Sequence, residues 1–201
     1  MSIDYTKIKT DARVEKFTDV LASRSKDLTI VLENLFDGHN LSAALRTCDA
    51  TGVFGVNILY HANNPVPKLG KKASASARKW LDLYHHSSVE DCFSKLRSEG
   101  KKIYTTHMSS ESISLYDLDL TQPIALVFGN EHDGVSEEAR DLADGNFLVP
   151  QVGMIQSLNI SVAVAVSLYE ALRQRKLAGM YESKNFQEEE FNEILNKWLS
   201  K

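Results

Sequence analysis

Hydrophobic positions recur along the chain with two different spacings, which predict helices and strands in alternation. Apolar residues at helical spacing indicate an amphipathic helix over 11–24: Val14, Phe17, Val20 and Leu21. Strands are expected at 29–35, 56–60, 81–85, 102–106, 124–128 and 147–149, and those at 29–35 and 124–128 are expected to be buried. Helical patterns occur at 39–51, 89–98, 136–142, 157–177 and 187–199. The polar stretch 62–77 is expected to be a loop or a short helix.

This alternation predicts an α/β fold in which a mostly parallel sheet carries helices on both faces. Ligands bind such sheets beyond the carboxyl ends of the strands, so the loops that follow these ends are where chemistry is expected. Neither the glycine pattern of a dinucleotide site nor that of a P-loop occurs. A length of 201 residues suits one domain, expected at 28–179, with helical extensions at 1–27 and 180–201.

Composition narrows the class of protein. No stretch approaches the roughly 20 apolar residues that a membrane span requires, and residues 1–17 lack the apolar core of a secretory signal. Cys48 and Cys92 are isolated and form no metal-binding pair. We therefore expect a cytoplasmic protein with reduced thiols, no metal ion and no membrane association.

The net charge of −4 argues mildly against a polyanionic partner, but the basic residues are clustered. One cluster without acidic residues contains Lys68, Lys71, Lys72, Arg78 and Lys79. Another contains Arg173, Arg175 and Lys176. Local patches of this kind bind phosphate whatever the net charge is, and they equally suit a solubilising surface.

A first candidate for chemistry lies where the first strand leads into a helix near Asn40. This residue fits a helix cap. Arg46 follows six residues later among alanines, and we expect its guanidinium to be partly enclosed. An enclosed guanidinium needs an anionic or carbonyl partner, such as an RNA phosphate. A surface ion pair is the plain alternative.

Two further strand ends lead into glycine-containing loops. Gly129, Glu131 and Gly134 follow the strand at 124–128, where a backbone without side chains can approach a ligand closely. The strand at 147–149 is followed by Pro150, Gly153, Ser157, Asn159 and Ser161, with Ser157 expected to cap the long helix. Free N–H groups at a helix start also hold anions.

Together and in this order, the three segments resemble the three motifs of the SpoU/TrmH family of SPOUT methyltransferases. The family pattern N-x-x-x-x-x-R corresponds to Asn40–Arg46, and G-x-E-x-x-G corresponds to Gly129–Gly134. The third pattern, a proline, a glycine and S-L-N-x-S, corresponds to Pro150–Ser161. The resemblance covers the chain from about residue 11 to its C-terminus.

The resemblance implies a C-terminal trefoil knot that holds S-adenosylmethionine. The positions that match the family's cofactor contacts are Thr106, Gly129, Val149, Ile155 and Leu158. It also implies a site at a homodimer interface that methylates ribose 2′-hydroxyls. The matching catalytic residues are Arg46, Asn40, Glu131, Ser157 and Asn159. Arg46 either activates the hydroxyl or, because arginine stays protonated, stabilises charge and fixes a phosphate; both roles remain open.

The substrate that the resemblance implies is tRNA, with the ribose of D-loop guanosine 18 as the target. Alternatives are another tRNA position, ribosomal RNA, or a catalytically silent RNA-binding homologue. The residues expected to contact RNA are basic or polar and lie outside the cofactor loops: Arg13, Lys16, Arg24, His39, Lys71, Lys72, Arg173 and Arg175.

Overall fold

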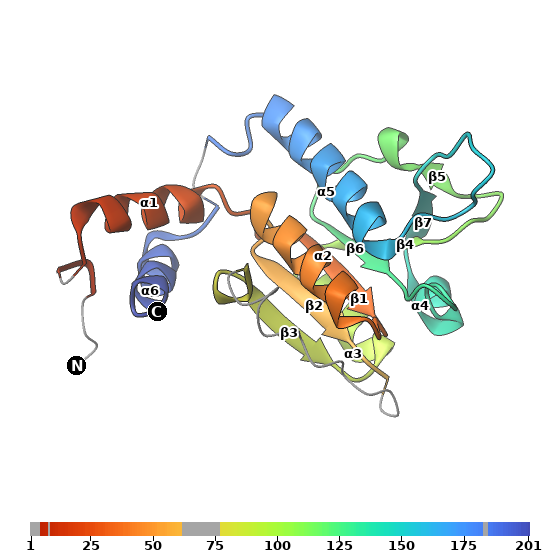
Figure 1. The fold of residues 1–201 in the computed structure, drawn as a ribbon, viewed down its shortest axis with the longest axis horizontal. Helices are drawn as coiled ribbons and strands as arrows, with labels where there is room; N and C mark the ends of the chain where they lie inside the picture. Colours follow the sequence, from red (N-terminus) through yellow and green to blue (C-terminus); the bar gives the residue numbers. More distant parts are fainter. Residues whose placement is uncertain (1–4, 8, 62–76, 183–184) are drawn as a thin grey trace.

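The computed structural model describes residues 5–7, 9–61, 77–182 and 185–201 (Figure 1). Most of the predicted loop or short helix at 62–77 lies outside the described residues. Lys68, Lys71 and Lys72 lie outside them too, so their predicted contacts with RNA stay predictions. Within the described part, the 3-10 helix η2 (Ala77–Lys79) follows this segment.

One seven-stranded sheet forms the centre of the protein, and all its pairings are parallel. The strands are β1 (Leu28–Glu33), β2 (Gly55–Leu59), β3 (Asp82–His86), β4 (Lys102–Thr106), β5 (Ile113–Ser114), β6 (Ile124–Phe128) and β7 (Gly145–Leu148). Their order across the sheet is β3-β2-β1-β6-β4-β7-β5. The predicted parallel sheet is confirmed, and β5 is an addition because two residues carry no periodic signal. The trefoil knot stays a prediction.

Helices cover both faces of this sheet, as predicted. They are α1 (Asp11–Ala22), α2 (Gly38–Ala50), α3 (Val89–Ser98), α4 (Glu137–Leu142), α5 (Ile160–Leu177) and α6 (Glu188–Leu199), with the 3-10 turns η1 (Tyr5–Lys7) and η3 (Leu115–Asp117). Side chains alternate along β1, so Ile30 and Leu32 pack with α2 and α5, whereas Val31 packs with α3 and α4. Figure 1 shows α2 and α5 side by side on one face.

The two ends of the chain pack against each other beside the sheet. Figure 1 shows α1 and α6 next to one another, away from α4 and α5. Their shared core is aromatic: Trp80 lies 5.0 Å from Phe17 and 5.6 Å from Trp198, measured between ring centroids, in edge-on geometry. The N- and C-terminal extensions therefore form one structural unit.

Two arginines that we expected to contact RNA are instead buried. Arg24, 1% exposed, donates to the carbonyls of Asp49 and Val53 and forms an ion pair with the Asp49 carboxylate. Arg175, fully buried, donates to the carbonyls of Leu120 and Gln122 at 2.8 and 3.0 Å and to Asp27 at 2.6 Å. Neither guanidinium can reach a phosphate, so both leave the expected RNA-binding set. The sequence alone does not show whether an arginine faces solvent or the core.

Candidate active site

The loop after β6 is rigid and requires glycine at two positions. Asn130 and Gly134 exchange two backbone hydrogen bonds, at 3.2 and 3.1 Å, and the Asn130 side chain accepts from the N–H groups of residues 132 and 133. A Cβ on Gly129 would lie 1.9 Å from the Gly134 carbonyl oxygen, and Gly134 has φ +68°. The loop therefore presents Glu131 from a fixed backbone.

Both helices that border this loop begin at residues other than those we predicted. The side chain of Asp37 caps α2 by accepting from the His39 N–H, and Asn40 lies inside the first turn. Asn159 caps α5 by accepting from the Ser161 N–H at 2.9 Å. Ser157 therefore lies in the loop before the helix. These displacements leave the Asn40 amide and the Ser157 hydroxyl free of capping roles.

The three motifs meet in a chain of hydrogen bonds. The Asn159 amide donates to the Asn40 side-chain oxygen at 3.3 Å, and the Asn40 amide donates to Oε1 of Glu131. These partners are 119 and 91 residues apart in the chain. Both amides donate in the same direction, so the array ends on the carboxylate. The fold thus joins three of the five predicted catalytic residues by direct contacts.

A cavity of ≈ 820 Å³ opens beside this array. Its volume lies within the roughly 300–1,000 Å³ typical of small-molecule sites. All five residues predicted to bind the cofactor line it: Thr106, Gly129, Val149, Ile155 and Leu158. Glu131, Ser157 and Asn159 line it as well. Three of the five predicted catalytic residues therefore share one cavity with the predicted cofactor residues.

The lining fits a nucleoside that carries a positively charged sulfonium. Val149, Ile155 and Leu158 offer apolar side chains suited to a purine ring. Glu131 and Asp133 supply negative charge on the same wall. Gly129 lines the cavity without a side chain. These features match the chemistry of S-adenosylmethionine.

Arg46 does not join this cluster within a single chain. Its side chain is exposed and has no hydrogen-bond or ion-pair partner among the described residues. It is also absent from the described lining of the cavity. The helical repeat places it on the same face of α2 as His39, seven residues earlier and also exposed. The expectation that the fold of one chain partly encloses this guanidinium is therefore wrong.

Some lining residues were missed by sequence reasoning. His107 and Arg140 border the cavity, and their side chains approach each other to 3.5 Å between Nε2 and Nη1. The loop after Thr106 was marked as a place for chemistry, but it contains no motif that singles out His107. Arg140 lies inside a short helix, where an arginine is ordinary.

Both cysteines have unreactive thiols. Cys48 and Cys92 are free and buried, and burial raises the pKa of both thiols, that of Cys92 to about 12. They stay protonated near neutral pH and are neither nucleophiles nor metal ligands there. Among the described residues no cluster of His, Cys, Asp and Glu is arranged to hold a metal ion.

We expect Gly129→Ala to weaken the binding of S-adenosylhomocysteine about tenfold or more, because relieving the overlap costs about 1–3 kcal/mol. Gly153 is the matched control, since it lines the same cavity and an added Cβ there meets nothing within 4 Å. Titration calorimetry on both variants measures the difference. Equal affinities for the two variants would show that the Gly129 loop does not contact the cofactor.

Comparison with known proteins places these features in context. Residues 27–169 match the model of the SpoU rRNA Methylase family. A Thermus thermophilus protein named tRNA (guanosine(18)-2'-O)-methyltransferase is 43% identical over 196 residues, which cover 96% of this chain and 98% of the relative. An Escherichia coli K12 protein of the same name is 39% identical, covering 86% of this chain and 75% of its own length.

Solved structures show the same likeness. The structure titled A. aeolicus TrmH/SpoU tRNA modifying enzyme superposes with a TM-score of 0.87 at 37% identity, covering 94% of this chain and 96% of that one. An AdoMet-bound rRNA methyltransferase from Sinorhizobium meliloti gives 0.66 at 25% identity, covering 78% and 59%. Within the described part of this chain, no helix has the length and apolar character needed to cross a membrane.

Proposed function

We propose, from the premise that this chain belongs to the SpoU rRNA Methylase family, that it is a methyltransferase acting on the ribose 2′-hydroxyl of guanosine 18 in tRNA. Its methyl donor is S-adenosylmethionine. The observation that carries the proposal is the hydrogen-bonded array of Asn159, Asn40 and Glu131 at the rim of a nucleoside-sized cavity. The near full-length similarity to relatives named for guanosine 18 supports the choice of nucleotide.

The protein's part in the reaction is to align a hydroxyl with an electrophile. When bound, S-adenosylmethionine supplies a methyl group on a sulfonium. The Asn40 amide donates to Oε1 of Glu131. The other carboxylate oxygen, Oε2, has no hydrogen-bond donor among the described residues and is available to a substrate. We propose that Oε2 accepts a hydrogen bond from the ribose hydroxyl, orients its oxygen and takes up its proton when that oxygen is methylated. The two asparagines hold this carboxylate in place.

Arg46 supplies positive charge in this scheme. A guanidinium stays protonated in proteins, so it is a poor acceptor for the hydroxyl proton. We propose that it binds the RNA phosphate next to the target ribose and stabilises the negative charge that grows on the 2′-oxygen. Because one chain leaves this side chain away from its own cavity, Arg46 of the partner subunit completes the site in a homodimer.

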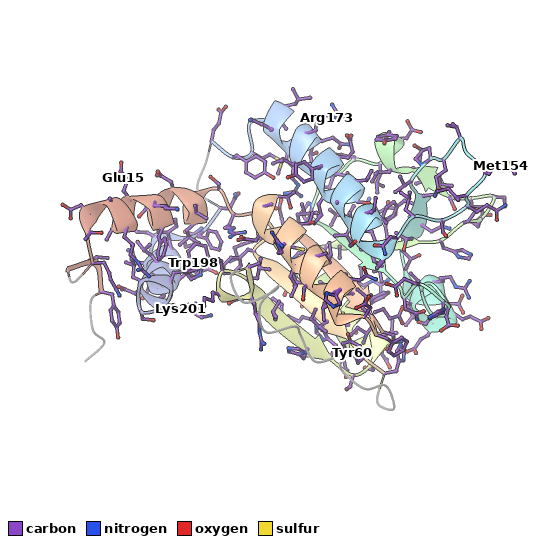
Figure 2. The ribbon with its side chains drawn as sticks, viewed as in Figure 1. Glu15, Tyr60, Met154, Arg173, Trp198 and Lys201 are labelled. Atoms are coloured by element: carbon purple, nitrogen blue, oxygen red, sulfur yellow. The ribbon has the colours of Figure 1, made fainter. Side chains whose placement is uncertain are left out.

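The surface of α5 supports a homodimer. This helix exposes Val162 and Tyr169 at 44% and 54%, and the preceding loop exposes Met154 almost completely (Figure 2). The apolar face of α6 is already covered by α1 of the same chain, so we assign the two-fold contact to α5 and its loop.

Light scattering at tens of micromolar should give twice the 22.5 kDa mass of one chain. Tyr169→Asp should shift the protein to monomers, because it places a charge in the middle of the contact. Val20→Asp is the control, since Val20 is 40% exposed on α1, outside the proposed interface. A monomeric wild type, or equal dissociation by both variants, would contradict the assignment.

The remaining basic residues suggest how RNA docks. Lys16 and His39 are exposed, Arg13 lies half-buried over the Phe17 ring, and Arg173 projects from α5 (Figure 2) while paired with Glu170. We propose that the extension 1–27, through Arg13 and Lys16, binds the tRNA backbone together with His39 and Arg173 of the SPOUT domain at 28–179. Such contacts recognise shape and phosphates more than sequence.

The proposed function is tested by incubating the protein with labelled S-adenosylmethionine and unmodified tRNA, followed by nucleoside mapping. We expect one 2′-O-methylguanosine at position 18, and steeply weaker RNA binding as salt rises. Ribosomal RNA is the second substrate to try, because a 23S rRNA methyltransferase from Xanthomonas campestris is 36% identical over 156 residues. A methyl group found only at another tRNA position, or only in ribosomal RNA, would refute the assignment.

A further inference from the structure

Glu33 is a buried carboxylate outside all the motifs discussed so far. It is the last residue of β1, and none of its surface is exposed. Oε1 lies 2.8 Å from Nε2 of His61, just beyond β2, and Oε2 accepts the Ser136 N–H at 3.0 Å. A buried carboxylate is retained only where its environment satisfies it. This one joins segments 28 and 103 residues away in the chain.

Both carboxyl oxygens of Glu33 have a polar partner. Ser136 contributes a backbone N–H, which can only donate, and the ring nitrogen of His61 can donate to the other oxygen. His61 is held at two points. Its backbone N–H donates to the Asn34 side chain at 3.2 Å, and its ring nitrogen Nε2 contacts Glu33. Glu33 is therefore fixed on both sides.

Ser136 stands at the stem of the loop that carries Glu131. The loop is closed by the Asn130–Gly134 hydrogen bonds, and Val135 behind it is buried. Ser136 then caps α4 by accepting the Ala139 N–H at 3.2 Å. Because the loop is rigid, a displacement of its stem moves Glu131 as well. The hydrogen bond from Ser136 to Glu33 ties that stem to β1, the strand that leads into α2 and Asn40.

We propose that Glu33 is a positioning residue for methyl transfer. By accepting the Ser136 N–H while braced by His61, it sets where the Glu131 loop meets Asn40. This inference rests on the proposed function, since it assigns Glu33 to the geometry of that same site. Glu33 itself does not line the described cavity and touches no reacting atom. It acts only through the loop.

Glu33→Ala should lower kcat about tenfold to a hundredfold, because small misplacements at a distance have effects of that size. The KM for tRNA should stay nearly unchanged, since Glu33 is buried and contacts no RNA. Glu33→Gln should restore most of the rate, because its oxygen can accept from Ser136 while its amide donates to a neutral His61 ring. A residue needed only for folding would change the amount of active protein instead.

A double-mutant cycle separates positioning from general destabilisation. If Glu33 acts through Glu131, then Glu33→Ala should cause little further loss of kcat in a Glu131→Ala background. Urea unfolding on the same four proteins should show that the losses of stability add. Full multiplication of the two kcat effects would overturn the proposal, and so would a failure of Glu33→Gln to restore the rate.

A second pair of variants tests the hydrogen bond should Glu33→Ala fail to fold. Ser136 has φ −59°, which proline adopts without strain, so Ser136→Pro removes its N–H. Ser136→Ala keeps the N–H and loses the same capping hydroxyl. We expect a lower kcat and faster hydrogen exchange across 129–135 in the proline variant only. Equal behaviour of the two variants would overturn the proposal.

The exchange measurement needs no methyl transfer. It still tests the anchoring of the loop if the wild-type protein proves inactive on every RNA. Inactive wild type with slow exchange that the proline variant accelerates would refute the proposed function and leave the anchoring intact. An active wild type whose exchange is the same as that of the proline variant would support the proposed function and refute the anchoring of the loop.

Discussion

Replacing Arg46 with alanine is expected to lower kcat by about 10²–10³-fold, the loss typical of removing one preorganised group that stabilises a developing oxyanion. The guanidinium is exposed and has no partner among the described residues, so the folded chain should tolerate its removal. It is also absent from the described lining of the cavity, so the affinity for S-adenosylhomocysteine should not change. Single-turnover methylation and calorimetry measure the two quantities.

Two further variants sharpen the Arg46 experiment. Arg46→Lys should restore little activity, because lysine keeps the charge and lacks the planar fork that grips phosphate. Arg97→Ala is the matched control, since this exposed arginine on α3 pairs with Asp144 on the opposite face of the sheet. Near-full turnover in Arg46→Ala would remove Arg46 from the mechanism. A fall in the affinity for S-adenosylhomocysteine would show that Arg46 contacts the cofactor, contrary to the proposal that it binds an RNA phosphate.

Replacing Arg175 with alanine is expected to destabilise the protein by about 3–5 kcal/mol, the loss typical of removing one member of a buried ion pair. The substitution leaves two backbone carbonyls, of Leu120 and Gln122, and the Asp27 carboxylate without their donor. Those carbonyls belong to the segment before β6, and Asp27 stands immediately before β1. The guanidinium therefore ties α5 to the start of two central strands.

Arg173→Ala is the control within the same cluster. This side chain is 58% exposed, and its hydrogen bonds to Glu170 lower the pKa of that carboxyl. Its removal should leave the urea midpoint nearly unchanged and weaken only the binding of RNA. The two arginines were predicted to act together on RNA, so a large loss of stability in both variants, or in neither, would contradict their separation into a structural and a surface residue.

The sequence by itself determined the architecture and the chemical parts of the site. Strand β6 begins and ends where the apolar run does, because a strand buried on both faces must be apolar along its whole length. Gly129, Glu131 and Asn159 were identified because a strand end, a missing side chain and a polar group at a helix start leave local traces. These features depend on residues that are adjacent in the chain, so they can be predicted from the sequence.

Only the tertiary structure decided which arginines work at the surface and which hold the fold together. Arg173 and Arg175 are two residues apart on one helix, and the helical repeat turns one to solvent and the other to the segment before β6. The contacts of Glu33 with Ser136, and of Asn40 with Glu131, join parts of the chain about a hundred residues apart. Burial and such pairings depend on what packs opposite a residue, and no local pattern encodes that.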